Sequence, residues 1–306
     1  MTRSKRKTPM ATTRFHLYRR VLAALVAASL SFAVSAQSLR AQSTADQPAT
    51  ASTPPALLQA GSLGPVETAR GVLAPTGVLR IGVYLGSPSS LVRSADGSPR
   101  GVTVDLGRAL AQRLGVAAQL VEFERLAAVL DALKVGQVDM TVTNATAARA
   151  EIVDFTAPIL SLELGYLVPA GSRINSIAQV DQAGVRIGVS QGSSSQAALT
   201  RQLKQATIVP AASLQIAAQM LQTEKLDAFA TNKAILFELA DQLSSATLLP
   251  GRWGLEHMAI GIPKGRDAGR PLLAEFAQQI RHDGSVQRAA DRAGLRGTAD
   301  TAVQTN

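Results

Sequence analysis

The sequence predicts an α/β protein built from two similar lobes that are joined by a hinge of two strands. Short apolar strand patterns alternate with helical patterns along the chain, which is typical of sheets whose faces are covered by helices. The pattern of the first half then returns in the second half, and a late strand followed by further helices indicates that the chain crosses back to the first lobe. Two crossings between the lobes make a two-strand hinge, and a cleft lies between the lobes.

The N-terminus has the pattern of a secretory signal peptide. An apolar run from Val21 to Val34 follows a basic segment and ends at the small-residue site Val34-Ser35-Ala36. The run is too short for a typical membrane span, although a retained anchor is the alternative. We therefore expect residues 1–36 to be cleaved and the mature protein to be periplasmic. The basic segment contains Arg3, Lys5, Arg6, Lys7, Arg14, Arg19 and Arg20.

The charge of the mature chain is close to balanced. The 306-residue sequence has a formal net charge of +9, but cleavage after Ala36 leaves 24 basic and 22 acidic side chains. No basic patch of the kind that binds nucleic acid is evident, so no nucleic-acid partner is expected. The chain has no cysteine, which excludes disulfides, thiol chemistry and thiolate metal sites. No metal-ligand spacing stands out, and we expect no metal and no cofactor.

Residues 37–75 are rich in Gln, Ser, Ala, Thr and Pro and predict a flexible linker before the first lobe. The first part of lobe 1 is expected at 76–165, with helix 104–114 burying Leu106, Leu110 and Leu114 and ending at Gly115. The other predicted elements of this part are strands 78–83, 120–123 and 138–143 and helix 124–134.

The second lobe is expected at 166–256. Strand 185–189 again leads into a Gly/Ser loop, and helices follow at 195–204 and 213–223. Residues 133–144 and 221–232 share the same spacing of Leu, Asp and a final Thr-Asn pair. Ligands of open α/β sheets gather at the carboxyl ends of strands. The two pairs are therefore expected on opposite walls of one cleft, and they are Thr143-Asn144 and Thr231-Asn232.

The end of the chain is expected to return to lobe 1 over residues 257–297, before a disordered tail at 298–306. Strand 258–264 precedes helices at 271–282 and 286–293. The hinge strands are expected near 162–168 and 255–260. Lobes joined in this way can close on a ligand.

Residues 141–158 contain the strongest chemical signal. Thr146 is a natural N-cap, and Arg149 lies in the first turn of the helix that follows. Basic side chains are disfavoured there, so this arginine indicates that an anion binds nearby. The alternative is a capped helix with a solvated arginine. The loop at Ser193–Ser195 has the same two interpretations, an anion nest or simple helix capping.

These segments together resemble the family 3 extracellular solute-binding proteins, the periplasmic amino-acid-binding proteins of ABC transporters. The resemblance spans about residues 78–297 and implies the type II periplasmic binding protein fold. The matching segments are LRIGV at 79–83, DG at 96–97, GVTVDL at 101–106, GQVD at 136–139, TAARA at 146–150, VDFT at 153–156, QGSS at 191–194, LDA at 226–228 and IGIPKG at 260–265.

The resemblance implies a role for most of the candidate site. Arg149 matches the arginine that clamps the ligand carboxylate, and Thr146 and Asn144 match positions that supply hydrogen bonds. Ser193 and Ser194 match the part of lobe 2 that completes the carboxylate site. The family implies a monomer that captures a small solute and delivers it to an inner-membrane permease.

Departures from the family pattern concern the ligand. The family usually has an acid, which pairs with the ligand ammonium, where this chain has Asn232. Positions that often carry an acid and aromatics appear here as Tyr84, Ser87 and Ser90. We therefore expect a carboxylate-bearing ligand, an amino acid or related organic acid, whose second pole need not be cationic. An α-ammonium would need another acid in the cleft, but exposure statistics favour a solvated surface position for each candidate. The candidates are Glu124, Glu163 and Glu256.

Two other functions are compatible with this fold. Some relatives are periplasmic dehydratases of the cyclohexadienyl dehydratase type, which need a placed acid or base. His257, near the hinge, is the candidate histidine, but a structural role is favoured. A sensor on this fold usually has a membrane helix and an output domain after it, and the polar C-terminus of this sequence shows neither. The sequence thus favours a binding protein that is not an enzyme.

Overall fold

The computed structural model of the protein describes residues 64–243 and 245–299. The described residues belong to one compact unit. The expected signal peptide at 1–36, residues 37–63 of the expected linker and most of the expected tail lie outside the described residues.

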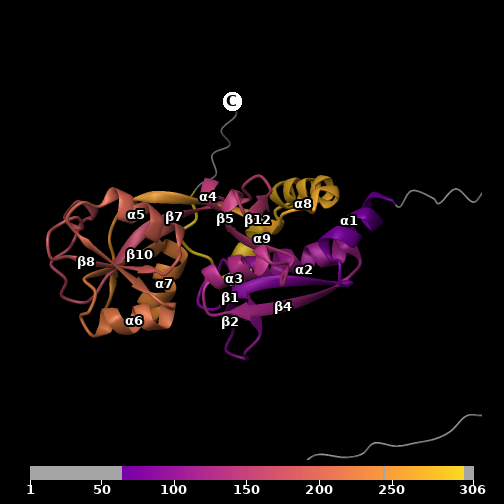
Figure 1. Cartoon of the computed structure of the whole chain (residues 1–306). Coiled ribbons are helices and arrows are strands. Elements are labelled where there is room, and N and C mark those ends of the chain that lie inside the picture. Colours follow the sequence, from indigo (N-terminus) through magenta and orange to yellow (C-terminus); the bar gives the residue numbers. More distant parts are fainter. Residues whose placement is uncertain (1–63, 244, 300–306) are drawn as a thin grey trace, which may run out of the picture. The chain divides into compact units, whose positions relative to one another are not determined.

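The first lobe begins with a parallel pair of strands that is covered by helices (Figure 1). Strand β1 (Val78–Tyr84) pairs in parallel with β4 (Ala117–Phe123), and Ile81 forms a parallel bridge to Met140, just before β5 (Thr141–Asn144). Helix α2 (Val102–Leu114) begins two residues earlier than predicted and ends at the left-handed Gly115. Helix α3 (Leu126–Lys134) follows β4.

A sheet of eight strands connects the two lobes. The path runs β5, β12, β7, β10, β8 and β9, with β6 beside β12 and β11 beside β7. The expectation of mostly parallel strands is wrong for the centre of this sheet, because β12 runs antiparallel to β5, β6 and β7. The bounds are β6 Val153–Phe155, β7 Leu160–Val168, β8 Arg186–Ser190, β9 Thr207–Ala211, β10 Ala228–Asn232, β11 Thr247–Leu248 and β12 Gly254–Pro263.

Strands β7 and β12 are the hinge of the fold. Their antiparallel pairing places Glu256 opposite Leu162 and Met258 opposite Leu160. Each strand also pairs onward with a strand of one lobe, β12 with β5 and β7 with β10. The two strands therefore connect the lobes through continuous backbone hydrogen bonds, as the sequence predicted.

The second lobe surrounds β8, β9 and β10 with three helices. They are α5 (Ser194–Gln202), α6 (Leu214–Gln222) and α7 (Lys233–Gln242). Helix α7 was not predicted, although Asn232 caps it by accepting a hydrogen bond from the Ile235 N–H. The buried side chains form clusters around Tyr166 and Phe229 that are distinct from the core of the first lobe.

The C-terminal helices complete the first lobe. Helices α8 (Arg270–His282) and α9 (Ser285–Ala293) lie beside α1 (Pro65–Leu73) and α2, which are far away in sequence (Figure 1). Phe276 and Ile280 share one hydrophobic cluster with Leu106 and Leu110. The division into 76–165, 166–256 and 257–297 stays a proposal, and β12 continues across the last of these boundaries.

The expected flexible linker at 37–75 is corrected at its C-terminal end, because Pro65–Leu73 forms helix α1. Proline stands at the start of the helix, where its missing N–H costs nothing. Ala69 and Leu73 lie one turn apart and are buried in the core of the first lobe. The Arg70 Nε also donates to the Leu114 carbonyl, at 2.6 Å.

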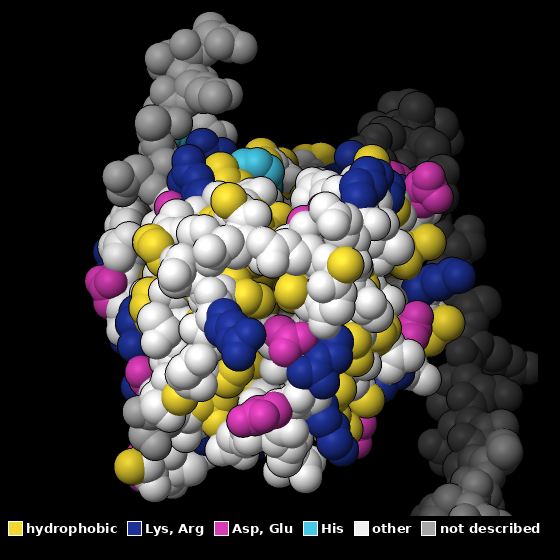
Figure 2. All heavy atoms as spheres, turned by 90° about the vertical axis from the view of Figure 1, so that its left-hand side faces the viewer, with side chains coloured by type: hydrophobic (Ala, Val, Ile, Leu, Met, Phe, Trp, Pro, Cys, Tyr) yellow, Lys and Arg dark blue, Asp and Glu magenta, His cyan; other side chains and the backbone are white. Residues whose placement is uncertain are grey.

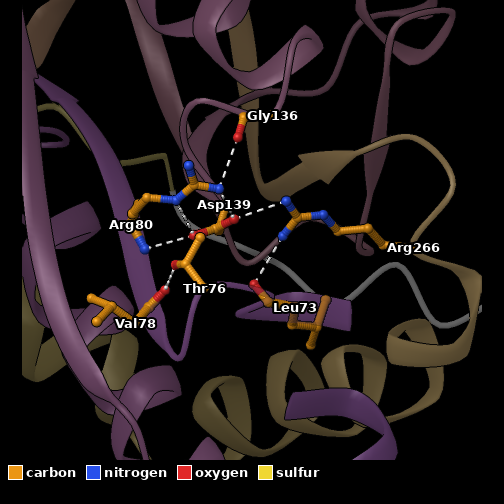
Figure 3. A network of polar contacts seen from close by, with 7 residues as sticks. All are labelled: Leu73, Thr76, Val78, Arg80, Gly136, Asp139 and Arg266. Carbon is orange, nitrogen blue, oxygen red and sulfur yellow. Dashed lines mark hydrogen bonds and ion pairs between the residues drawn. The ribbon is translucent and has the colours of Figure 1, made fainter. Parts of the chain in front are cut away.

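A buried carboxylate ties the return segment to the first strand (Figure 3). Asp139 is fully buried and accepts hydrogen bonds from Arg80 at 2.7 and 2.8 Å and from Arg266 at 2.8 Å. Arg266 also donates to the Leu73 carbonyl. The Arg186–Asp227 pair has the same geometry in the second lobe, at 2.9 Å, but no second arginine among the described residues forms an ion pair with it. The repeated pattern in the sequence therefore corresponds to a repeated ion pair, Arg80 with Asp139 in the first lobe and Arg186 with Asp227 in the second.

One face of the second lobe carries charges of both signs. In Figure 2, basic and acidic side chains alternate over the face that is turned to the viewer, among its described residues. None of the helices in the described ranges is long and apolar enough to cross a membrane. The remaining short elements are β2 (Val92–Arg93), β3 (Pro99–Arg100), α4 (Ala147–Ala150) and two 3₁₀ turns at Ile177–Gln179 and Asp267–Gly269.

Candidate functional site

A cavity lies where the two lobes face each other, and it leaves about 40 Å³ for the centres of water-sized spheres. Elements of both lobes and of hinge strand β12 contribute to it. The lining residues are Tyr84, Glu124, Arg125, Leu126, Thr143, Asn144, Ser190, Gln191, Ser193, Ser194, Ala212, Ser213, Leu214, Thr231, Asn232, Ile235, Glu256 and Met258.

Four helices begin at this cavity. The first or capping residues of α3, α5, α6 and α7 are part of its lining, and they include Leu126, Ser194, Leu214 and Asn232. A helix N-terminus carries a partial positive charge and unpaired N–H groups. Their convergence makes the cavity attractive to anions.

The repeated Thr-Asn pairs meet here as expected. Thr143 and Asn144 end β5, Thr231 and Asn232 end β10, and all four line the cavity. The two strands belong to equivalent places in the two lobes, so their carboxyl ends face a common space. The Asn144 Oδ1 also accepts a hydrogen bond from the His257 N–H, which couples this wall to the hinge strand.

Arg149 lies directly behind this wall. Its side chain is held by hydrogen bonds from Nη1 to the Thr143 hydroxyl (3.0 Å) and to the Asn144 carbonyl (3.1 Å). The residue is 7% exposed, and its Nη2 is buried without a hydrogen-bond partner. Burial lowers the pKa of the guanidinium, and the nearby Glu256 and Tyr84 oppose this shift. Arg149 is therefore not a solvated arginine, and it retains an unused donor.

The other predicted site residues fall into two groups. Tyr84, Asn144, Ser193, Ser194 and Asn232 line the cavity, whereas Thr146 and Arg149 do not. Thr146 caps α4 by accepting from the Arg149 N–H, at 3.3 Å, and so positions the arginine backbone. Burial raises the pKa of the Tyr84 phenol, which keeps it a neutral hydrogen-bonding group. The ligand-binding roles of all seven stay predictions.

Glu256 corrects the expectation of a solvated acid. It is 7% exposed, lies on hinge strand β12 and lines the cavity. Its Oε1 accepts from the Ser194 hydroxyl at 2.8 Å, and its Oε2 accepts from the Asn232 amide at 3.0 Å. A carboxylate thus lies beside Asn232, and it comes from β12, which is separated from β10 by β7. Only the register of β12 brings it there, and the sequence contains no local signal for that register.

The remaining candidates near the ligand site differ from the expectation. Glu124 lines the cavity but is exposed, and Glu163 lies outside the lining, where it binds Lys233 at 2.6 Å and Arg252 at 3.0 Å. Those two cations, with the Lys233 hydrogen bond first, lower the pKa of Glu163. Ser87 and Ser90 are buried behind Tyr84 and do not line the cavity, and the Ser90 hydroxyl accepts from the Tyr84 N–H.

Arg125 is a cavity residue that the sequence prediction missed. It occupies the N-cap position of α3 and lines the cavity, and its Nε is buried without a partner. The available signal was a basic residue at the start of an apolar helix, which is the same signal that identified Arg149.

The structure shows the lobes in contact across the mouth of the cavity. A side-chain carbon added at Gly192 would lie 2.9 Å from the Cβ of Ala127, and one added at Gly86 would lie 3.0 Å from Leu214. Both glycines have positive φ, of +74° and +93°. At each of these contacts a glycine of one lobe therefore meets a side chain of the other lobe, and this is a closed arrangement of the lobes.

No metal centre is recognisable in the described part of the chain. No cluster of His, Cys, Asp or Glu there could hold a metal ion. His257 is exposed, does not line the cavity and contacts the Ser161 hydroxyl through Nδ1, at 3.1 Å. Its position does not place a proton-transfer group at the cavity.

Two hinged α/β lobes around an interlobe cavity define the class of type II periplasmic binding proteins. The chain belongs to the bacterial extracellular solute-binding proteins, family 3, whose model matches residues 79–294. It is 30% identical over 117 residues to the L-arginine-binding protein of Pseudomonas aeruginosa. That match covers 38% of this chain and 44% of the relative, less than half of the relative's length.

Solved structures show the same fold. A putative binding component of an ABC transporter from Wolinella succinogenes, complexed with lysine, has a TM-score of 0.63 at 24% identity and covers 71% of this chain and 95% of that chain. The ancestral amino-acid-binding protein AncCDT-1, a precursor of cyclohexadienyl dehydratase, has a TM-score of 0.62 at 23% identity, with 72% and 96% coverage. At these identities the likeness concerns the fold alone.

Proposed function

We propose that the protein is a periplasmic solute-binding protein of an ABC importer. It captures a small carboxylate-bearing solute of the amino-acid class between its lobes and delivers it to an inner-membrane permease. The observation that carries the proposal is the buried Arg149 guanidinium, which has an unpaired Nη2 beside a cavity where four helix N-termini converge. Family membership supports the same function.

The carboxylate is the first group to be recognised. A guanidinium presents a rigid fork of donors that matches the two oxygens of a carboxylate. Nη1 of Arg149 is already used to fix the side chain against Thr143 and Asn144, so its orientation is set before the ligand arrives. Preorganised donors in a dry site bind more strongly than mobile ones in water.

Glu256 extends the proposal to the second pole of the ligand. Glu256 and Arg149 influence each other electrostatically, yet no ion pair joins them in the described structure. An α-amino acid can therefore place its carboxylate at Arg149 and its ammonium at Glu256. The L-arginine-binding protein to which part of the chain is similar supports the amino-acid class.

Closure is the step that retains the ligand. In the open form, Arg149, Asn144 and Tyr84 of the first lobe present the first contacts. Ser194 and Asn232 of the second lobe contact Glu256 in the closed structure and shield the site. The ligand favours the closed state because it interacts with both lobes only there. Delivery to a permease follows from this closed state.

Substitution of Arg149 tests the proposal. Arg149→Met should lower the affinity for the carboxylate ligand by about 2–5 kcal/mol, because the buried carboxylate loses its charge partner. Arg149→Lys should retain part of the affinity, since it keeps the charge and loses the fork. Isothermal titration calorimetry after a thermal-shift screen of amino acids and organic acids measures both.

Arg173→Met, which removes an exposed arginine that does not line the cavity, is the control and should bind like the parent. Thermal melting of each variant checks that it is folded. If Arg149→Met is folded and binds with the affinity of the parent protein, the assignment of the carboxylate site is wrong.

A dehydratase-like enzyme is the second candidate, because a precursor of cyclohexadienyl dehydratase shares the fold. That relative is itself described as an amino-acid-binding protein. Incubation with prephenate and detection of product by absorbance distinguishes the two functions. We expect no turnover above the rate of the uncatalysed reaction.

A further inference from the structure

We infer that Arg125 is a second anion anchor and that the ligand carries a second anionic group, which Arg125 binds. The inference rests on the proposed function, because it concerns the same cavity. It narrows the ligand to a small solute with two carboxylates, either an acidic α-amino acid or a dicarboxylate without an ammonium group.

The first support is that the Arg125 side chain has no recognisable structural role in the described part of the chain. Its Nε is buried without a hydrogen-bond partner, and no carboxylate in the described chain forms an ion pair with it. Arginines with a structural role in this protein are recognisable by their hydrogen bonds to backbone carbonyls and carboxylates. Arg70 donates to the Leu114 carbonyl, and Arg266 donates to Asp139 and to the Leu73 carbonyl. A buried donor without a partner is costly and indicates a missing partner.

The second support is the location of Arg125. Its side chain is part of the cavity lining, and its backbone occupies the N-cap position of α3, which has no side-chain cap. The N-terminus of this nine-residue helix adds its own partial positive charge to that of the guanidinium. Glu124 also lines the cavity but is exposed, so solvent screens its charge. An anion at this end of the cavity would meet both the helix and the guanidinium.

The third support is the relation between the two arginines. Arg125 follows β4 and Arg149 follows β5, so consecutive strand–helix units of one lobe supply them. Each has one buried nitrogen without a partner. Two cations on one lobe allow two-point recognition before the lobes close. A ligand with a single carboxylate would leave one of these donors unpaired in the closed site, at the cost of its desolvation.

Calorimetry with matched ligands tests the inference. L-glutamate and L-aspartate are compared with L-glutamine and L-asparagine, which have nearly the same shape but a neutral end. We expect the acids to bind at least about tenfold more tightly than their amides, since each amide leaves Arg125 without a counter-charge. Glutarate and 2-oxoglutarate, which have no ammonium group, distinguish the two ligand classes. If they bind as tightly as glutamate, the ligand is a dicarboxylate. If they bind more weakly than glutamate, the ligand is an acidic amino acid.

The variant Arg125→Gln assigns the effect to this residue. It should weaken binding of the preferred dianion by about tenfold to a thousandfold and change binding of the corresponding amide by less than about threefold. Arg108→Gln is the matched control, because it removes the same charge from an exposed site on α2 that lies outside the cavity lining. Thermal melting checks that both variants are folded.

The possible failures are distinguishable. Equal or tighter binding of amides or of cationic amino acids by the parent protein overturns the second anchor but leaves the proposed function intact. If the Arg125→Gln variant still prefers acids over their amides as the parent protein does, the second anchor is likewise overturned and the proposed function stays intact. Absence of binding to every amino acid and organic acid in the screen overturns the proposed function itself.

Discussion

Asp139 and Asp227 occupy equivalent places in two copies of one local structure, yet their surroundings differ. Asp139 is fully buried between two arginines, whereas the side chain of Asp227 is 33% exposed and pairs with Arg186 alone. Its hydrogen bonds to Arg186 lower the pKa of Asp227. When one partner of a buried ion pair is removed, water cannot take its place, and the other charge stays buried without a partner. The same sequence motif therefore has two different energetic roles.

Asparagine substitutions should separate these roles. Asp139→Asn should lower the free energy of unfolding by about 3–5 kcal/mol, because it leaves two arginine side chains without their buried counter-charge. Asp227→Asn should cost about 1 kcal/mol or less, since solvent screens that pair. Chemical denaturation at neutral pH measures both. Equal losses in the two variants would show that the second arginine and the burial of Asp139 contribute nothing.

Helix α1 shows how an element can be misjudged from composition. Its residues belong to a stretch rich in Gln, Ser, Ala, Thr and Pro, but Val66, Ala69 and Leu73 recur at helical spacing. The core of the first lobe covers this face, and Arg266 from the return segment donates to the Leu73 carbonyl. Helix α1 is thus part of the first lobe.

Leu73→Ala tests this role of α1. Leu73 is 1% exposed, and its truncation should lower the free energy of unfolding by about 2–5 kcal/mol. Val135→Ala removes an apolar side chain that is 68% exposed and should change stability by less than about 0.5 kcal/mol. Denaturant titration followed by circular dichroism compares them. A loss at Leu73 no larger than that at Val135 would mean that α1 does not pack on the lobe in solution.

The whole molecule depends on how closely its lobes approach each other. Gly192 of the β8–α5 loop faces Ala127 of α3, and an added side chain would lie 2.9 Å from that residue's Cβ. A residue larger than glycine would therefore hold the rims apart. Because closure is the step that buries the ligand, this contact connects the loop geometry to affinity.

Gly192→Ala should weaken ligand binding, mainly through faster dissociation, and should enlarge the ligand-bound protein in small-angle scattering. Gly171→Ala is the matched control. Gly171 also has positive φ (+69°), but an added side chain there meets nothing within 4 Å. Both substitutions therefore place a side chain at a residue with positive φ, and only Gly192→Ala adds a close contact with Ala127. Adding Ala127→Gly to Gly192→Ala should restore affinity, and failure to do so would rule out the rim contact as the cause.

Local signals accounted for much of the fold and for part of the candidate site. The helix of Leu106, Leu110 and Leu114, the turn at Gly115 and the N-cap at Thr146 all depend on residues close in sequence. The Thr-Asn pairs were found because the two lobes repeat one pattern. Glu256 was misassigned, since its burial depends on the register of β12 against β7, and burial of an acid is disfavoured unless tertiary partners such as Ser194 and Asn232 are present.

The sequence by itself determined the alternation of strands and helices, the repeat and the arginine at a helix start, because periodicity and capping act over a few residues. The tertiary structure decided which charges lie at the cavity. Arg125 and Glu256 line it from the start of α3 and from the hinge strand, and Arg149 lies behind the wall formed by Thr143 and Asn144. Only the packing of these elements places the three charges around one site. Electrostatic interactions depend on distance in space rather than along the chain, so the chemistry of the site follows from the fold.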